Sequence, residues 1–237
     1  PLSSSRISDA FNASENLPKE GTKQDSLEFS LMKTRLEIYY ENIPSNSLRT
    51  FKSRVKDDPV DKNIYGLALA HKKNNEYKDS IQLIDKLIDS YPKNLVINNT
   101  KVDILFEFGE YEEALNLANR FLEISPRNYP LSISKAKILL SMNRYFESEE
   151  IIRDQLLRKN SYPELWFLLS EIQRSSKNII GYHQSRAEYF LLLGQNERAL
   201  NQLEFALKLT QNNFQVSESI MTKIIEIKKN INQSRGL

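Results

Sequence analysis

The side chains that most often do chemistry in proteins are scarce in this sequence. Its two histidines, His71 and His183, lie far apart, and neither belongs to an HExxH pair. A catalytic zinc ion usually takes three protein ligands, largely histidine, and the chain has no cysteine that could supply a thiolate. We therefore predict no metal site. Repeat arithmetic gives His71 a packing position inside a helical hairpin, and His183 lacks the partners that a ligand role needs.

Motifs for nucleophilic catalysis and phosphate binding are also absent from the sequence. The six glycines never cluster into a phosphate-binding loop, and no G-x-S-x-G segment occurs. The carboxylate pairs Glu112–Glu113 and Glu149–Glu150 stand at expected helix starts, where they offset the helix dipole. We expect no catalytic residue and no cofactor, so this fragment is not predicted to be an enzyme by itself.

Composition excludes several other classes. The 33 basic and 31 acidic residues nearly cancel, whereas a nucleic-acid-binding protein gathers lysines and arginines on one face. No apolar run approaches the ~20 residues that span a bilayer, and without cysteine there is no disulfide. The sequence begins at Pro1, with neither an initiator methionine nor a signal peptide, which leads us to expect a fragment or a processed product.

A period of 34 residues organises the middle of the chain. Three residue types recur at this interval, and they are tyrosine (Tyr77, Tyr111, Tyr145), a small residue (Ser80, Ala114, Ser148) and proline (Pro92, Pro126). This is the length of the tetratricopeptide repeat (TPR), which consists of two antiparallel helices. The period predicts an all-α fold, a TPR superhelix of antiparallel helix pairs with a capping C-terminal helix.

The segment "GEYEEALNLANRFLEISP" shows why these residue types recur. Gly109 can end one helix because it adopts positive φ at little cost, and Tyr111 begins the next. Ala114 is small enough for two helices to approach closely. Pro126 ends the second helix, since it has no amide hydrogen for the helical ladder. Each hairpin leaves an apolar face that only a neighbouring hairpin can cover.

The period also divides the chain. We expect regular repeats at 61–94, 95–128 and 129–162, an irregular unit at 163–193, a restored half repeat at 194–210 and a cap helix at 214–231. The unit at 163–193 is expected to be irregular because its second helix lacks the tyrosine and the small residue. Residues 26–60 predict a non-standard helical pair, and the polar, serine-rich residues 1–25 predict a linker or docking arm.

A TPR array presents a concave surface that is lined mainly by the first helix of each hairpin. The residues expected to face it are Tyr65, Leu69, Lys72, Asn99, Asp103, Phe106, Ile133, Lys137, Phe167, Glu171 and Arg174. Such a mixture suits an extended peptide or a folded edge. The alternative is that several of these residues pack against the next hairpin. TPR domains that bind chaperone tails carry lysine and asparagine where Tyr65 and Leu69 stand, which argues against this type of carboxylate clamp.

Three stretches resemble one particular family. "HQSRAEYFLLLGQNERALNQLEFAL", from His183 to Leu207, resembles the late helices of the BepA/YfgC-type periplasmic zinc metalloproteases. "YGLALAHKKNNEYKDSI" is similar to the first well-formed repeat of that family. "PLSSSRISDAFNAS" resembles the segment that joins its protease and repeat domains, and Pro1, Arg6, Ile7 and Ala10 match that string. The chain departs from the usual repeat where Lys101 and Lys135 replace an apolar residue, which predicts less regular packing there.

The resemblance implies an N-terminal HExxH protease domain, with its zinc ion, that is missing from this sequence. It also implies a Gram-negative periplasm and a repeat domain that acts in outer-membrane quality control. Its partners would be the β-barrel assembly machinery, misassembled outer-membrane proteins and its own protease domain, which Arg6 and Ile7 would help to dock. Two alternatives remain open: a self-standing TPR scaffold unconnected to proteolysis, and, less favoured by the missing motifs, an enzyme complete in this chain.

Overall fold

The computed structural model describes residues 25–210 and 213–235. Within these residues every regular element is an α-helix, as predicted. The helices are α2 (Leu27–Tyr40), α3 (Pro44–Asp57), α4 (Asp61–Lys73), α5 (Tyr77–Ser90), α6 (Leu95–Phe108), α7 (Tyr111–Ile124), α8 (Tyr129–Ser141), α9 (Tyr145–Leu156), α10 (Pro163–Ser175), α11 (Ile179–Leu192), α12 (Asn196–Lys208) and α13 (Phe214–Arg235). Arg6 and Ile7, with most of the predicted arm, lie outside the described residues.

The backbone repeats with the period of the sequence. Helices start 34 residues apart in two series, from Asp61 through Leu95 and Tyr129 to Pro163, and from Tyr77 through Tyr111 and Tyr145 to Ile179. The turns within the pairs repeat as well, because Asn75, Gly109, Asn143 and Lys177 have φ of 61°, 92°, 60° and 62°. A left-handed residue therefore closes each hairpin, and three of the four are not glycine.

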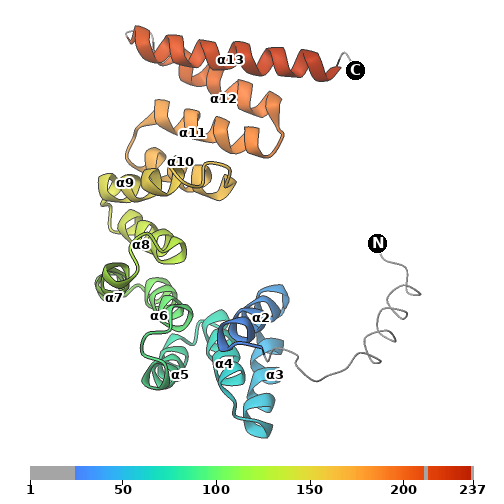
Figure 1. Ribbon diagram of the computed structural model, residues 1–237, viewed down its shortest axis with the longest axis vertical. Coiled ribbons are helices and arrows are strands. Elements are labelled where there is room, and N and C mark those ends of the chain that lie inside the picture. The colour runs from blue at the N-terminus through green and yellow to red at the C-terminus, as the bar shows by residue number, and fades with distance from the viewer. Residues whose placement is uncertain (1–24, 211–212, 236–237) are drawn as a thin grey trace, which may run out of the picture.

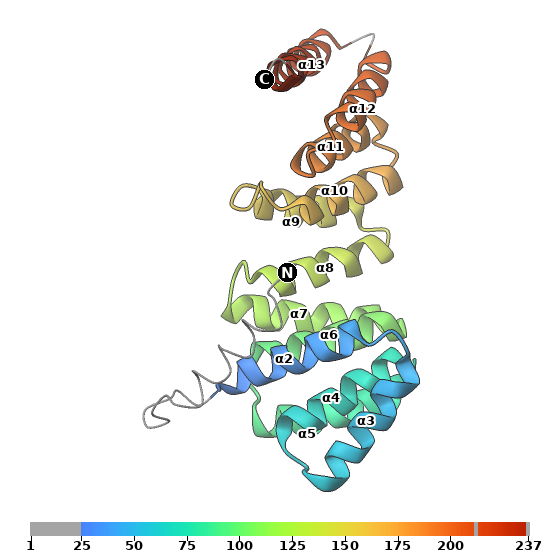
Figure 2. The same cartoon turned by 90° about the vertical axis from the view of Figure 1, so that its right-hand side faces the viewer.

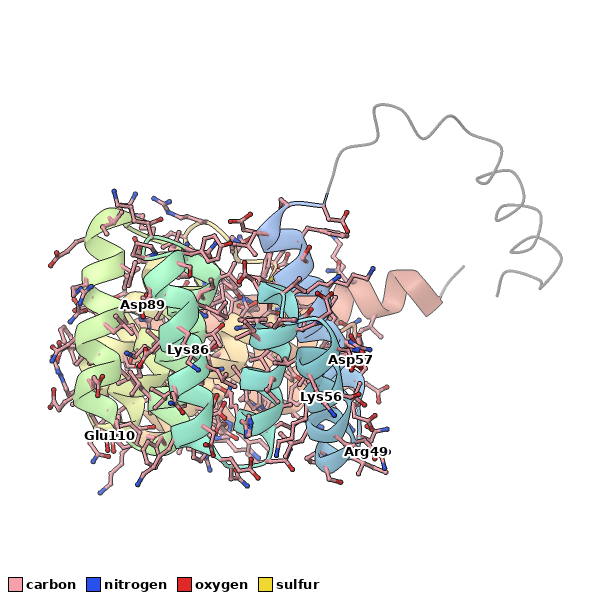
Figure 3. The ribbon with its side chains drawn as sticks, turned by 90° about the horizontal axis from the view of Figure 1, so that it is seen from below. Arg49, Lys56, Asp57, Lys86, Asp89 and Glu110 are labelled. Atoms are coloured by element: carbon pink, nitrogen blue, oxygen red, sulfur yellow. The ribbon has the colours of Figure 1, made fainter. Side chains whose placement is uncertain are left out.

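The helices form an arc with distinct inner and outer sides. Helices α4, α6, α8 and α10 line the inner side, while α5, α7 and α9 lie on the outer side (Figure 1). The outer helices carry exposed charges, as Figure 3 shows for Lys86 and Asp89 on α5 and for Arg49, Lys56 and Asp57 on α3. Charged side chains of these helices therefore lie in contact with solvent.

Small residues hold the two helices of a hairpin close together. Ser80 and Ser148 are fully buried, and their hydroxyls donate to the carbonyls of Ala68 and Ala136 across the hairpin, at 2.7 Å in each case. Ala114, at the same repeat position, is also fully buried. A larger side chain at these positions would push the helices apart.

The register changes by half a repeat near the C-terminal end. Gly194, with φ of 71°, follows the previous left-handed turn residue, Lys177, after only 17 residues. Helix α11 consequently packs against both α10 and α12. The small residues Ala199 and Ala206 lie buried in the cluster that α11, α12 and α13 share.

The first pair, α2 and α3, differs from the others because it does not form a close hairpin. Glu41 stands one period before Asn75 but has extended backbone, with φ of −73° and ψ of 117°. Their backbones lie apart, and each helix packs against α4 instead, although the Arg54 guanidinium of α3 donates to both oxygens of Glu37 on α2. A cavity of about 350 Å³ lies between the two helices and is lined in part by Ile38, Ser47 and Phe51. Because no left-handed turn folds α2 and α3 into a hairpin, α2 can pack on α4.

Candidate functional site: the inner face of the array

Helix α2 covers the first half of the inner face. Figures 1 and 2 show it on the inner side of α4 and α6. Its buried residues Leu31 and Ile38 belong to one apolar cluster with Tyr65, Leu69 and Ile104. Apolar burial of this kind is the dominant stabilising term for a docked helix.

A network of side-chain hydrogen bonds joins α2 to α4 and α6 at the centre of this contact. The Arg35 guanidinium donates to Tyr65 Oη at 3.2 Å and to Thr100 Oγ1 at 2.7 Å. Tyr65 Oη lies 2.9 Å from Thr100 Oγ1, which itself donates to the Val96 carbonyl at 2.8 Å. Thr100 therefore accepts from both side chains, and Tyr65 donates to it. Asp103, 3.9 Å from Arg35, compensates the charge.

Both ends of α2 are also held. At its C-terminal end, Lys73 Nζ donates to the carbonyls of Ile38 and Glu41, where a cation also suits the helix dipole. At its N-terminal end, Asn94 donates to Glu28 Oε1 at 2.8 Å. Helix α2 is thus an integral part of the array.

This placement changes the predicted groove. Tyr65, Leu69 and Asn99 are buried, with exposed fractions of 0%, 6% and 7%. Helix α2 covers Tyr65 and Leu69, whereas Asn99 packs against the next hairpin, where its Oδ1 accepts from Ser134 Oγ at 3.4 Å. Phe106 is half-buried as well, with its ring 5.8 Å from that of Tyr111. Tyr65 and Asn99 are therefore buried within the array, Leu69 reaches the surface only at the cavity described next, and Phe106 is partly accessible.

A cavity of about 440 Å³ remains at the C-terminal end of α2. The predicted residues Leu69, Lys72 and Asp103 line it together with Arg35, Ile38, Tyr39, Lys73 and Glu107. Lys72 Nζ is paired with Glu107 Oε1 at 2.8 Å. The cavity combines an apolar base with paired charges, and this arrangement suits binding of a side chain.

The second half of the inner face is open. Lys137 on α8 and Arg174 on α10 are exposed, and Phe167 leaves 42% of its surface in water. Glu171 is half-buried and pairs with Arg174 at 2.5 Å. Ile133, also half-buried, packs against the apolar cluster of α8, α9 and α10. The predicted groove residues of this half are therefore partly accessible.

An aromatic cluster around Arg186 was not found from the sequence. The Arg186 guanidinium lies 5.1 Å from the Phe167 ring centroid, 5.2 Å from that of Tyr189 and 5.1 Å from that of Phe190. Such contacts orient a guanidinium and leave its edge available for hydrogen bonds. The missed signal was that arginine occupies the repeat position of three fully buried apolar residues, Ile84, Ala118 and Ile152.

The two histidines have hydrogen-bond partners in the structure. Nδ1 of the buried His71 lies 2.5 Å from Glu76 Oε2, and Nδ1 of His183 lies 2.8 Å from Gln202 Oε1. The ligand atoms of His71, Glu76 and Asp79 lie within 4.8 Å of one another and could hold a metal ion. However, both carboxylates stand at the start of α5, where the helix dipole accounts for them without a metal.

An ionisable tyrosine marks the start of the open half. Burial, followed by the nearby Glu164 carboxylate, raises the pKa of Tyr129 to about 12. Its hydroxyl donates to Glu164 Oε1 at 3.3 Å, and Lys159 Nζ lies 4.2 Å from its ring centroid. The pKa of Tyr129 therefore depends on the contact between α8 and α10 and can be used to monitor it.

No helix within residues 25–210 and 213–235 combines the length and apolar character that a membrane span requires. Comparison with protein families gives one match, in which residues 105–172 fit a family model described as Tetratricopeptide repeat. No curated protein sequence is detectably similar to the chain.

Solved structures share the fold. PilW, described as a widely conserved type IV pilus biogenesis factor, superposes with a TM-score of 0.60 at 14% identity, over 84% of this chain and 93% of its own. PilF from Pseudomonas aeruginosa gives 0.59 at 15% identity, over 84% and 90%. A tetratricopeptide repeat protein from Parabacteroides merdae gives 0.52 at 12% identity, over 93% and 92%. The fold is a TPR-like superhelix, as the period predicted.

Proposed function

We propose that this chain is a protein-binding scaffold that holds a partner segment against the inner side of α8, α10 and α11. The observation that carries the proposal is the exposed Phe167 ring beside the Arg186 guanidinium. Aromatic and arginine side chains are the residue types most enriched at the centres of protein interfaces. On the outer side Phe146 of α9 is also exposed, but it is not part of this aromatic and arginine cluster.

The chemistry of this surface favours a partner segment with an apolar side chain next to a carboxylate. Phe167, Tyr189 and Phe190 offer aromatic faces, and Arg186 and the exposed Lys137 carry positive charge. A guanidinium fixed in one orientation binds a carboxylate through two parallel hydrogen bonds. Charge would set the register of the segment, and the rings would supply most of the affinity.

Site-specific cross-linking tests the scaffold. A photoreactive amino acid at position 167 should cross-link a defined partner, whereas the same residue at position 146 should not. Phe146 is a matched control because it is an exposed aromatic residue on the outer helix α9. Phe167→Ala should then reduce partner capture about tenfold, the loss expected for one interface anchor. Equal cross-linking from both positions would count against the inner face.

The finer proposal is that the scaffold is the docking domain of a periplasmic zinc metalloprotease or chaperone. It would bind the outer-membrane barrel assembly machinery or misassembled outer-membrane proteins, and catalysis would belong to a separate zinc-containing domain. The support is the resemblance of the stretches from Tyr65 to Ile81 and from His183 to Leu207, together with the opening string. The likeness to PilW and PilF is one of fold at 14% and 15% identity, so it does not favour any partner.

The coding sequence upstream of Pro1 tests this finer proposal. An HExxH helix, a signal peptide and a histidine directly before Pro1 would support the protease. A start codon close to Pro1 would contradict it and leave a self-standing scaffold. We also expect no peptidase activity from this chain alone when zinc is supplied, and activity would favour an enzyme complete in this chain.

A further inference from the structure

Helix α2 presents a second apolar face that nothing in the described chain covers. Opposite the residues that pack on α4, its side chains Phe29, Met32, Leu36, Tyr39 and Tyr40, with Ile43 just beyond the helix, are each between 44% and 74% exposed. We call these six residues the α2 stripe. A helix that is apolar on both faces is normally buried on both. We therefore expect another protein segment, the occupant, to cover the α2 stripe.

The spacing of the α2 stripe selects a helix as that occupant. Phe29, Met32, Leu36 and Tyr39 follow one another at intervals of three, four and three residues. This alternation is the one with which two helices interlock their side chains along a shared seam. The intervals also read the same in both directions. An antiparallel copy of α2 therefore matches the α2 stripe residue for residue, with Phe29 opposite Tyr39 and Met32 opposite Leu36.

We propose that the occupant is α2 of a second copy of this chain, so that the protein forms a two-fold dimer through the α2 stripe. A closed two-fold interface needs a self-complementary surface, and the palindromic spacing provides one. At about 100 Å² of exposed surface for each large side chain, the six residues offer about 600 Å² per chain. This approaches the roughly 800 Å² per partner of a stable interface.

A further observation supports this occupant. Helix α2 lies at one end of the arc, away from α10 to α13 (Figures 1 and 2), so the two arrays would extend in opposite directions from the shared seam. The dimer does not depend on the proposed partner surface, because that surface lies on other helices.

Cysteine cross-linking gives a direct test, because the native chain has no cysteine. In the antiparallel seam, position 32 of one chain meets position 36 of the other. A mixture of Met32→Cys and Leu36→Cys chains should therefore form a disulfide-linked dimer under mild oxidation, far more than either variant alone. A mixture of Met32→Cys with Phe146→Cys, whose position is exposed on α9, is the matched control.

The mass of the full chain in solution completes the test. Sedimentation should give twice the chain mass for the native protein and half that value for Leu36→Asp, with unchanged helical circular dichroism. Phe146→Asp should stay dimeric. A native chain that is monomeric throughout would overturn the proposal. So would a dimer that appears only after residues 1–24 are removed, because the chain's own leading segment would then be the occupant.

Discussion

Tyr65 and Phe167 occupy the same repeat position three periods apart, yet they have opposite environments. Tyr65 is fully buried, and its hydroxyl lies between Arg35 and Thr100. Phe167 leaves 42% of its surface in water. Between them, Asn99 is 7% exposed and Ile133 is half-buried. The difference teaches that accessibility along a repeat array is set by what covers each repeat as well as by the repeat position.

The covering helix arises from one departure in the repeat pattern. Glu41 takes extended backbone where the later hairpins have a left-handed residue. Helix α2 therefore lies across the inner side of α4 and α6 and does not pair with α3. The half of the array that it covers is largely buried, and the half that it leaves open is partly accessible.

The largest expected contrast is between Tyr65→Ala and Phe167→Ala. Truncating the buried Tyr65 leaves a cavity and unpaired polar groups, so we expect a loss of about 3 to 5 kcal/mol in the free energy of unfolding. The exposed Phe167 should lose less than about 1 kcal/mol. Urea denaturation of the two variants measures both values. Similar losses would mean that the two halves do not differ as described.

A second contrast concerns Gly66, which lies beneath Phe51 of α3. A Cβ added at Gly66 would lie 2.1 Å from Phe51 Cε1. Alanine normally favours a helix over glycine by about 1 kcal/mol, but here we expect overpacking to reverse the sign and cost about 1 to 3 kcal/mol. The same repeat position holds Thr100 and Ser134 in later repeats, so the requirement for glycine is local.

A double-mutant cycle isolates this contact. Phe51→Leu should itself destabilise the chain but should reduce the further cost of Gly66→Ala, because the smaller side chain can move aside. Additive losses in thermal or urea unfolding would show that Gly66 is needed for some other reason.

The sequence predicted the fold well because its signals are local. Glycine and proline at helix ends and small residues between helices act within a single hairpin, and the 34-residue period makes them visible. The position of α2 depends on tertiary contacts between Arg35 and residues 30 and 65 positions away, which no local pattern contains. Burial of Tyr65 was therefore not predictable from its register, whereas Asn99 packs against the next hairpin, the alternative that the sequence left open.

Arg186 is the opposite case, in which the sequence held a signal that was not used. An arginine at a repeat position otherwise filled by Ile84, Ala118 and Ile152 cannot be buried in the same way. The change marks the helix where the register moves by half a repeat. Departures from a repeat therefore mark positions where the packing of the array changes.

A smaller contrast concerns the two lysines that replace an apolar residue, Lys101 and Lys135. Lys101 is largely buried and pairs with Asp85 Oδ1 at 2.8 Å. Asp85→Asn should therefore lower the free energy of unfolding by about 1 kcal/mol. Asp89→Asn, at an exposed position on the same helix (Figure 3), should have almost no effect. If both variants behave alike, the ion pair does not explain how α6 accommodates Lys101.

The smallest expected effect is on the pH dependence of the open half. The pKa of Tyr129 is raised from 10.0 to about 12 by burial and by Glu164. Because the folded chain keeps this proton longer than the unfolded chain, the stability from Tyr129 is complete below pH 10. It is lost as the pH rises to about 12. Absorbance titration should show a late tyrosine signal that decreases in Tyr129→Phe, while Tyr91, whose pKa is also raised by its hydrogen bond to Asp61, still titrates late. In Glu164→Gln, Tyr129 should titrate earlier but still above 10, since burial is the larger cause. A Tyr129 whose pKa is not raised above 10.0 would mean that the contact between α8 and α10 is open in solution.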